Sequence, residues 1–214
     1  METTSDQNLI CYFGWGRRKY IEQTFPILLN TIRPQDRLLV LDQEMHNLDY
    51  YAQFKDQIDY LIFTKKNYRI GPAWELFKYI ALWLKTIKHS DVRWFPDYIN
   101  IIESDALIER GDWIDKLIPL FETEGQKIGI VSGYLGDDDP NTKVIRMIGT
   151  TRIKIGSQGV NVIVRTTDFL EIGDYPNYTQ DLYFQEKIQD KGRVACFPCI
   201  KHIGELGKKK GLIL

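Results

Sequence analysis

The sequence predicts an α/β fold with a mainly parallel central sheet, and two observations support this prediction. Short apolar runs that suit strands alternate with longer segments whose apolar residues recur at helical spacing. The strand–helix unit occurs three times before a further strand near residues 98–105, and such repetition is typical of parallel sheets with right-handed crossovers. With 214 residues, of which 43% are hydrophobic and 27% charged, the chain suits one globular domain with a substantial core.

Composition also excludes several classes of protein. The formal net charge of −1 provides no global basic field for nucleic acid. The polar N-terminus lacks a signal-peptide core, and no apolar run approaches the roughly 18 residues of a membrane span. Three cysteines do not make a disulfide framework. We therefore expect a cytoplasmic protein without a transmembrane segment.

The first predicted strand, residues 9–13, runs into a glycine-containing loop that precedes a helix over 18–32. A strand, a glycine loop and a helix in this order form a ligand-facing edge in α/β folds. The loop is neither a dinucleotide fingerprint nor a P-loop, because a third glycine and a GK[ST] sequence are missing. A solvated helix start is the alternative interpretation of the basic run at 17–19.

The second and third predicted strands, residues 37–42 and 58–63, flank a short helix near 48–57. Asp42 closes the second strand, where it could accept a hydrogen bond from a base or a ribose, or cap the next segment. A helix over 72–88 follows the third strand. Its amino end, with Arg69 nearby, is a candidate anion site.

The acidic residues that end the strand near 98–105 are the centre of the prediction. Glu103 and Asp105 are separated by Ser104 at the carboxyl edge of the sheet, where open α/β sheets bind ligands. In an extended segment both carboxylates would point to the same side. They could then hold Mg²⁺ or Mn²⁺ together with a diphosphate. A solvated acidic strand end is the alternative.

The second half of the chain predicts a mixture of short elements and one longer helix. Asp181 lies in the first turn of the helix that runs from about 178 to 191, where it could interact with the helix dipole or act as a general base. We interpret the acidic run 137–139 as a surface turn. The other expected elements are a helix over 112–124, a strand over 127–134, a hairpin of 143–148 with 152–155, a strand over 159–164, a short turn or helix over 166–171 and a last strand over 193–200.

Cys196, Cys199 and His202 have the spacing C-x₂-C-x₂-H, which prompts a test for zinc. Structural zinc requires four ligands with a second pair at a distance, and only Cys11 remains, inside a predicted strand. Two strand cysteines are therefore the better interpretation.

The order of these motifs resembles the family 2 glycosyltransferases, which have the GT-A fold. In that family the nucleotide-binding half ends in an acidic D-x-D-type motif, and the sequence Glu103-Ser104-Asp105 is similar to it. Two departures are Glu103 in place of the first aspartate and Gln180 where an acid is common. The further matches are Asn67 and Gly71 to the N-x-G turn, Asp42 to the acid that faces the nucleobase, 159–161 to the G-x-N segment, 180–184 to E-D-x-D-F, and His202 to the histidine that can complete the metal site.

The resemblance implies a three-layer, Rossmann-like GT-A domain over 1–214, with a small antiparallel hairpin near the acceptor side. Residues 8–110 would form the nucleotide-sugar-binding half, 111–207 the acceptor and catalytic half, and 208–214 a basic tail. The implied metal ligands are Glu103, Asp105 and His202. The implied donor-binding residues are Phe13, Gly14, Trp15, Arg17, Asp42, Asn67, Arg69, Gly71 and Ser104.

The implied activity is transfer of a sugar from a nucleotide-diphosphate sugar to an acceptor hydroxyl, with inversion. Mn²⁺ or Mg²⁺ would be the cofactor and Asp181 the general base. The acceptor class stays open among a glycan, a lipid-linked sugar, a protein and a modified DNA base. The alternatives are a nucleotidyltransferase of sugar phosphates and an inactive module that binds sugar nucleotides.

Overall fold

The computed structural model describes residues 6–67, 70–86, 94–135, 143–154, 159–172, 187 and 191–204. The strands are β1 Asn8–Trp15, β2 Arg37–Gln43, β3 Tyr60–Thr64, β4 Tyr98–Glu103, β5 Ala106–Ile108, β6 Ile128–Ser132, β7 Val144–Ile148, β8 Thr151–Lys154, β9 Asn161–Arg165, β10 Arg193–Cys196 and β11 Ile200–His202. The helices are α1 Arg18–Leu29, α2 Leu48–Tyr51, α3 Ile70–Thr86, α4 Trp113–Leu117 and α5 Thr166–Glu171, with 3₁₀ helices η1 Ala52–Gln57 and η2 Ile118–Glu122.

The central sheet has nine strands in the order β3-β2-β1-β4-β9-β6-β10-β8-β7, and β11 and β5 form a separate antiparallel pair. Strands β3, β2, β1 and β4 are parallel neighbours. Strand β9 is antiparallel to both β4 and β6, so β6 has the same direction as β4. Among the described strands of this sheet only β9 and β8 run against the common direction. The prediction of a mainly parallel sheet with an antiparallel hairpin, β7–β8, is confirmed.

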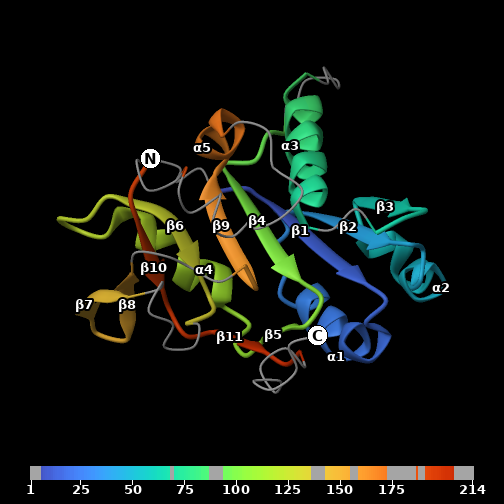
Figure 1. The fold of residues 1–214 in the computed structure, drawn as a ribbon, viewed down its shortest axis with the longest axis horizontal. Helices are drawn as coiled ribbons and strands as arrows, with labels where there is room; N and C mark the ends of the chain where they lie inside the picture. The colour runs from blue at the N-terminus through green and yellow to red at the C-terminus, as the bar shows by residue number, and fades with distance from the viewer. Residues whose placement is uncertain are drawn as a thin grey trace, which may run out of the picture.

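Alternation along the strands divides the core into two layers. In β1, Ile10 and Tyr12 pack on one face, whereas Leu9, Cys11 and Phe13 pack on the other, as the two-residue period of a strand requires. Helices α1, α2 and α4 cover the first face. Helices α3 and α5 cover the second and lie next to each other (Figure 1). The result is a three-layer arrangement with helices on both sides of the sheet.

Two predicted elements are divided by proline. The expected helix over 112–124 is α4 followed by the 3₁₀ helix η2, and Pro119 lies in the first turn of η2; proline inside a helix removes a backbone hydrogen bond and clashes with the preceding turn. The expected last strand over 193–200 is wrong. It is β10 in the main sheet and β11 in the small sheet, with Pro198, which lacks an N–H, between them.

The remaining expected elements differ less from the structure or lie outside the described residues. The strand near 98–105 ends at Glu103, and Ser104 and Asp105 form a turn that leads into β5. The hairpin and the short helix at 166–171 are confirmed. The acidic run 137–139 lies outside the described residues, and so does the helix over 178–191 apart from residues 187 and 191. None of the helices in the described ranges combines the length and the apolar character that a membrane span requires.

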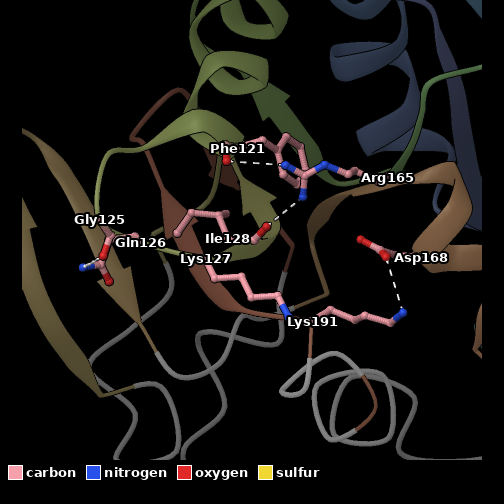
Figure 2. Close-up of a pocket in the computed structure, with 8 residues that line it drawn as sticks. All are labelled: Phe121, Gly125, Gln126, Lys127, Ile128, Arg165, Asp168 and Lys191. Atoms are coloured by element: carbon pink, nitrogen blue, oxygen red, sulfur yellow. Dashed lines mark hydrogen bonds and ion pairs between the residues drawn. The ribbon is translucent and has the colours of Figure 1, made fainter.

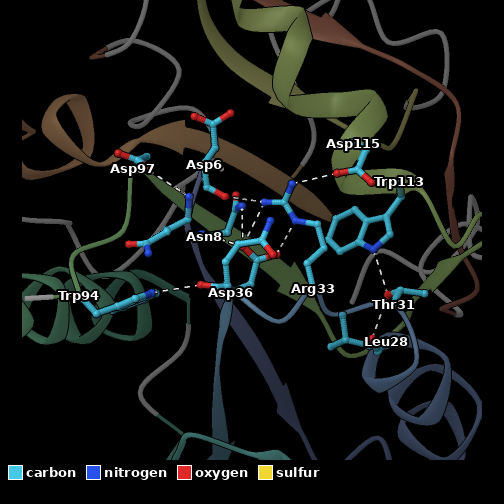
Figure 3. Close-up of polar contacts among 12 residues, drawn as sticks. Asp6, Asn8, Leu28, Thr31, Arg33, Asp36, Trp94, Asp97, Trp113 and Asp115 are labelled. Atoms are coloured by element: carbon cyan, nitrogen blue, oxygen red, sulfur yellow. Dashed lines mark hydrogen bonds and ion pairs between the residues drawn. The ribbon is translucent and has the colours of Figure 1, made fainter. Parts of the chain in front are cut away.

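A polar cluster holds the amino ends of β1 and β2 together (Figure 3). The buried Asp36 carboxylate accepts hydrogen bonds from the backbone N–H and the side-chain amide of Asn8, both at 2.9 Å, and from Nε of Arg33 at 2.8 Å. Arg33 also donates to the Asp6 carbonyl oxygen at 2.7 Å and to Asp115 at the start of α4 at 2.8 Å. One guanidinium thus joins the amino end of β1, the loop before β2 and a helix of the first layer.

Candidate functional site

The carboxyl ends of β1, β2 and β4 bring three predicted segments to one edge of the sheet. Gly14 in β1 pairs with Asp42 in β2, and Phe13 pairs with Glu103 in β4. Residues far apart in the sequence therefore lie side by side where an open α/β sheet binds its ligand.

The turn after β4 is fixed by hydrogen bonds from neighbouring elements. The Ser104 N–H donates to the Phe13 carbonyl oxygen at 2.9 Å, and the Ser104 carbonyl oxygen accepts from the hydroxyls of Thr24 at 2.8 Å and Tyr12 at 3.3 Å. A Cβ at Gly14 would lie 2.6 Å from Ser104 Oγ. Only a residue without a side chain permits this approach, so Gly14 has a packing role next to the turn.

Asp105 is the centre of the candidate site. Its side chain is fully buried, and Oδ2 contacts both the Arg17 guanidinium and Nε2 of His202, the latter at 3.1 Å. Arg17 precedes α1 at its N-cap position, and His202 ends β11, where it pairs with Ala106 of β5. The second oxygen, Oδ1, is buried and has no hydrogen-bond partner among the described residues. Three distant segments thus converge on one carboxylate that retains an unused acceptor atom.

The residues after β11 close over Asp105. The Ile203 N–H donates to the Asp105 carbonyl oxygen at 2.9 Å, and the Tyr134 ring packs edge-on against His202 with centroids 6.0 Å apart. A Cβ at Gly204 would overlap Asp105 Oδ2 and lie 2.7 Å from His202 Nε2. Sequence reasoning missed Gly204; a glycine just after the end of a strand is the only local signal that points to it.

The spacing of Asp105 and His202 would allow both side chains to bind one divalent cation. Adjacent ligands of an octahedral ion with bonds of about 2.1 Å lie about 3.0 Å apart, close to the 3.1 Å between Oδ2 and Nε2. The free Oδ1 is a further acceptor at the same place. Within the described ranges, however, no group of three or more His, Cys, Asp or Glu side chains could hold an ion. The protein would therefore supply two ligands, and phosphate oxygens and water would supply the rest.

Glu103, the third predicted metal ligand, lies half-buried at the end of β4 and does not join Asp105 and His202 in such a group. The expectation that both carboxylates share one extended segment is wrong, because β4 ends at Glu103 and Asp105 lies in the turn. The alternation of a strand therefore does not apply between the two residues.

Asp42 is fully buried, and both of its carboxylate oxygens accept hydrogen bonds from Asn47. The distances are 2.8 Å to the backbone N–H and 3.2 Å to the side-chain amide. Burial raises the pKa of Asp42 above its usual range, and these hydrogen bonds oppose that shift. Between the two residues, Glu44 and Met45 adopt positive φ angles of 64° and 56°, a conformation that is uncommon without glycine. Asp42 thus anchors a tight loop beside the ligand edge.

The other predicted donor-binding residues lie in several environments. Phe13 packs into the core, with its ring 5.9 Å from that of Phe77 in α3. Trp15 is the last residue of β1. Gly71 is buried in the first turn of α3, and Asn67 is half-buried shortly before it. Arg69 and the predicted base Asp181 lie outside the described residues.

The C-x₂-C-x₂-H residues do not gather at one place. Cys196 packs in the core layer of α3, Cys199 packs in the layer of α1, and His202 contacts Asp105. Burial raises the pKa of Cys196 to about 11 and that of Cys199 to about 12, so both are neutral thiols near neutral pH.

A cavity of about 700 Å³ lies at the opposite edge of the sheet (Figure 2). Arg165, which lines it, pairs with Tyr98 at the amino end of β4. Two cationic side chains of this cavity have partners within the chain. Arg165 stacks on Phe121 at 4.6 Å and donates to the Ile128 carbonyl oxygen at 2.9 Å. Lys191 pairs with Asp168 at 3.6 Å. This cavity therefore does not coincide with Asp105.

Comparison with known proteins identifies the fold. No protein-family model matches the chain, and no curated protein sequence does. Among solved structures, mannosyltransferase PcManGT from Pyrobaculum calidifontis, in complex with GDP-Man and Mn²⁺, is 12% identical with a TM-score of 0.65, covering 94% of this chain and 58% of that chain. Residues 1–349 of TarS from S. aureus, in complex with UDP-GlcNAc, are 13% identical with a TM-score of 0.62, covering 96% and 62%. TarS 1–349 in a further crystal structure is 13% identical with a TM-score of 0.61, covering 91% and 59%.

The chain spans about three fifths of the length of the chains it matches. At 12–13% identity the likeness concerns the fold, and it agrees with the parallel β3-β2-β1-β4 half-sheet and the antiparallel β11–β5 pair. The architecture expected from the motif order is thereby confirmed: the protein has the GT-A fold of the glycosyltransferases.

Proposed function

We propose that the protein is a glycosyltransferase that moves a sugar from a nucleotide-diphosphate sugar to an acceptor hydroxyl. The observation that carries this proposal is the convergence of Arg17 and His202 on the buried Asp105 at the carboxyl edge of a GT-A sheet. Support also comes from two structures of the same fold, whose ligands are UDP-GlcNAc and GDP-Man. The acceptor would be a glycan, a lipid-linked sugar, a protein or a modified DNA base.

In this proposal Asp105 and His202 bind Mn²⁺ or Mg²⁺, with Glu103 acting through water. When bound, the ion neutralises charge on the diphosphate leaving group. Asp105 is suited to this role because its position is fixed on both sides. Ser104 is held to β1, and the Asp105 carbonyl oxygen is held by Ile203. A carboxylate held in this way needs little reorganisation when the diphosphate arrives.

The nucleotide would lie along the ends of β1 and β2. Gly14 keeps the backbone clear at this edge. Because both oxygens of Asp42 are occupied by Asn47, we propose that Asp42 acts by holding the loop at residues 43–47 next to the nucleobase. Asn67, Gly71 and Arg69 would contribute from the amino end of α3, where backbone N–H groups and the helix dipole favour anions.

Asp181 is the proposed general base. It would accept the proton of the acceptor hydroxyl as the oxygen attacks the anomeric carbon from the face opposite the diphosphate, and the sugar would be transferred with inversion. This assignment rests on the similarity of residues 180–184 to the E-D-x-D-F motif. General base catalysis typically contributes about 10²–10⁴-fold to the rate.

The test is a transfer assay of the full chain with a panel of UDP- and GDP-sugars, acceptors of each proposed class, and Mn²⁺. We expect Asp105→Ala to reduce turnover by at least about a hundredfold, because the leaving group loses its counter-charge. Asp181→Asn should abolish turnover and leave donor affinity unchanged in calorimetry. Asp112→Asn, which removes an exposed carboxylate paired with Arg110, is the matched control and should be fully active.

Three results would contradict the proposal. Full activity of both the Asp105 and the Asp181 variants would exclude the assigned roles. Release of pyrophosphate from a nucleoside triphosphate and a sugar phosphate would identify a nucleotidyltransferase. Donor binding without turnover on any acceptor class would identify an inactive sugar-nucleotide-binding module.

A further inference from the structure

One oxygen atom in the candidate site has two competing partners. Oδ2 of Asp105 contacts the Arg17 guanidinium and also lies 3.1 Å from His202 Nε2, which makes it the oxygen that a cation bound by both residues would use. An arginine side chain stays protonated in proteins. A guanidinium and a divalent cation at the same oxygen repel each other strongly at such short distances. At Oδ2 the guanidinium and the cation therefore exclude each other.

The two sides of the Arg17–Asp105 pair differ in their freedom to move. The Asp105 side chain is fully buried, whereas that of Arg17 is 34% exposed. Arg17 follows Gly16, which has a φ of +60°, and lies at the N-cap of α1 outside the regular helix. Of the two side chains, only that of Arg17 already has access to solvent.

A buried carboxylate without a counter-charge is strongly unfavourable. Among the described residues, Arg17 is the only lysine or arginine that forms an ion pair with Asp105. The guanidinium therefore supplies the counter-charge that a cation at Asp105 would otherwise supply.

We propose that Arg17 and a divalent cation are alternative partners of Asp105, and that the cation displaces Arg17 toward the diphosphate. The second half of this statement rests on the proposed function, because it requires a nucleotide diphosphate at the sheet edge. Because the cation has to displace Arg17 from Asp105, the protein binds the metal alone less tightly than it would without this arginine. A bound diphosphate gives the freed guanidinium a new bidentate partner. Metal and nucleotide then favour each other's binding, as linkage requires.

The experiment measures Mn²⁺ affinity of the full chain by calorimetry without nucleotide or acceptor. We expect Arg17→Gln to bind Mn²⁺ at least about tenfold more tightly than the unmodified protein, the lower end of the effects seen when groups around metal ligands change. Asp105→Asn added to that variant should abolish the gain. Arg18→Gln is the charge-matched control, because Arg18 pairs with Glu22 at 2.7 Å and Asp49 at 3.0 Å instead.

A second measurement, thermal melting, tests whether the Arg17→Gln variant loses stability when no metal is present. In EDTA, Arg17→Gln should melt below the unmodified protein, because Asp105 lacks its counter-charge, and Mn²⁺ should restore the Tm. Arg17→Lys retains the charge and should keep weak Mn²⁺ binding. With UDP as the probe at saturating Mn²⁺, Arg17→Gln should bind at least about tenfold more weakly.

The proposal is overturned if Arg17→Gln binds Mn²⁺ no more tightly than Arg18→Gln, or if the gain survives Asp105→Asn. It is also overturned if Mn²⁺ fails to raise the Tm of Arg17→Gln. None of these measurements involves sugar transfer. A failed transfer assay would therefore leave the competition at Asp105 standing, and a failure here would leave the transfer assay unaffected.

Discussion

Gly204 shows how closely the chain approaches Asp105. A methyl group at this position would overlap Asp105 Oδ2 and lie 2.7 Å from Nε2 of His202. The two groups that form the candidate cation site would have to separate to make room. The missing side chain of Gly204 is therefore part of the geometry of the site.

We predict that Gly204→Ala weakens Mn²⁺ binding by about 10–100-fold, the range typical of changes around metal ligands. The measurement is a calorimetric titration of the full chain in the presence of UDP. Gly111→Ala is the matched control, because a Cβ at Gly111 has no neighbouring atom within 4 Å. Equal affinity of the two variants would mean that the close approach is unnecessary.

At the scale of elements, the cluster around Asp36 ties the amino ends of β1 and β2 to the helices of one layer. The opposite, carboxyl ends of the same strands form the candidate site. Polar side chains thus occur at both edges of the sheet. At the amino edge, the contacts of Arg33 and Asp36 that Figure 3 draws are with other groups of the protein. This indicates a structural role for the cluster around Asp36.

We predict that Asp36→Ala lowers the free energy of unfolding by about 2–4 kcal/mol, because it leaves a largely buried guanidinium and a buried amide without their acceptor. Denaturation in urea measures the change. Asp115→Ala removes the other carboxylate that pairs with Arg33, but this carboxylate is 61% exposed. It should cost less than about 1 kcal/mol. Similar losses for both variants would contradict the structural role assigned to Asp36.

At the scale of the whole molecule, the three cysteines report on both core layers. Cys11 and Cys196 pack on the face covered by α3, and Cys199 packs on the face covered by α1. All three are free thiols and buried. Burial raises the pKa of Cys11 well above its usual value, that of Cys196 to about 11 and that of Cys199 to about 12. Exposure of all three thiols therefore requires that both layers open.

We predict that a thiol reagent such as DTNB labels none of the cysteines rapidly in the native protein at pH 7.5 and labels all three in urea. Because the folded state raises these pKa values, the unfolded chain loses its thiol protons first. Stability is then fully present below pH 9.0, the usual cysteine pKa, and falls as the pH rises toward about 11–12. Rapid native labelling, or a cysteine-free variant with the same loss of stability above pH 9.0, would contradict this.

Local patterns account for most of the strands and helices. Short apolar runs identify β1, β2 and β4, because strands that are buried on both faces are apolar throughout. Helical spacing identifies α1 and α3, because burial of one face imposes that period on the residues. The same reasoning places Gly14, Asp42 and Glu103 at strand ends, where parallel strands share an edge. Two departures occur at prolines: Pro119 and Pro198 divide elements that apolar spacing alone makes continuous. A third is the turn at Ser104 and Asp105, which ends β4 at Glu103.

The contacts of the site itself come from pairings that no local pattern contains. The antiparallel insertion of β9 next to β4, the pairing of β11 with β5 and the approach of Gly204 all join distant segments. Arg17 and His202 reach Asp105 across 88 and 97 residues of sequence. Hydrophobic periodicity says which face of an element is buried, whereas the partner of a polar atom depends on how the elements are arranged in space. The residue types at the sheet edge could thus be read from the chain, and the packing of the folded protein decided that Arg17 and His202 meet on Asp105.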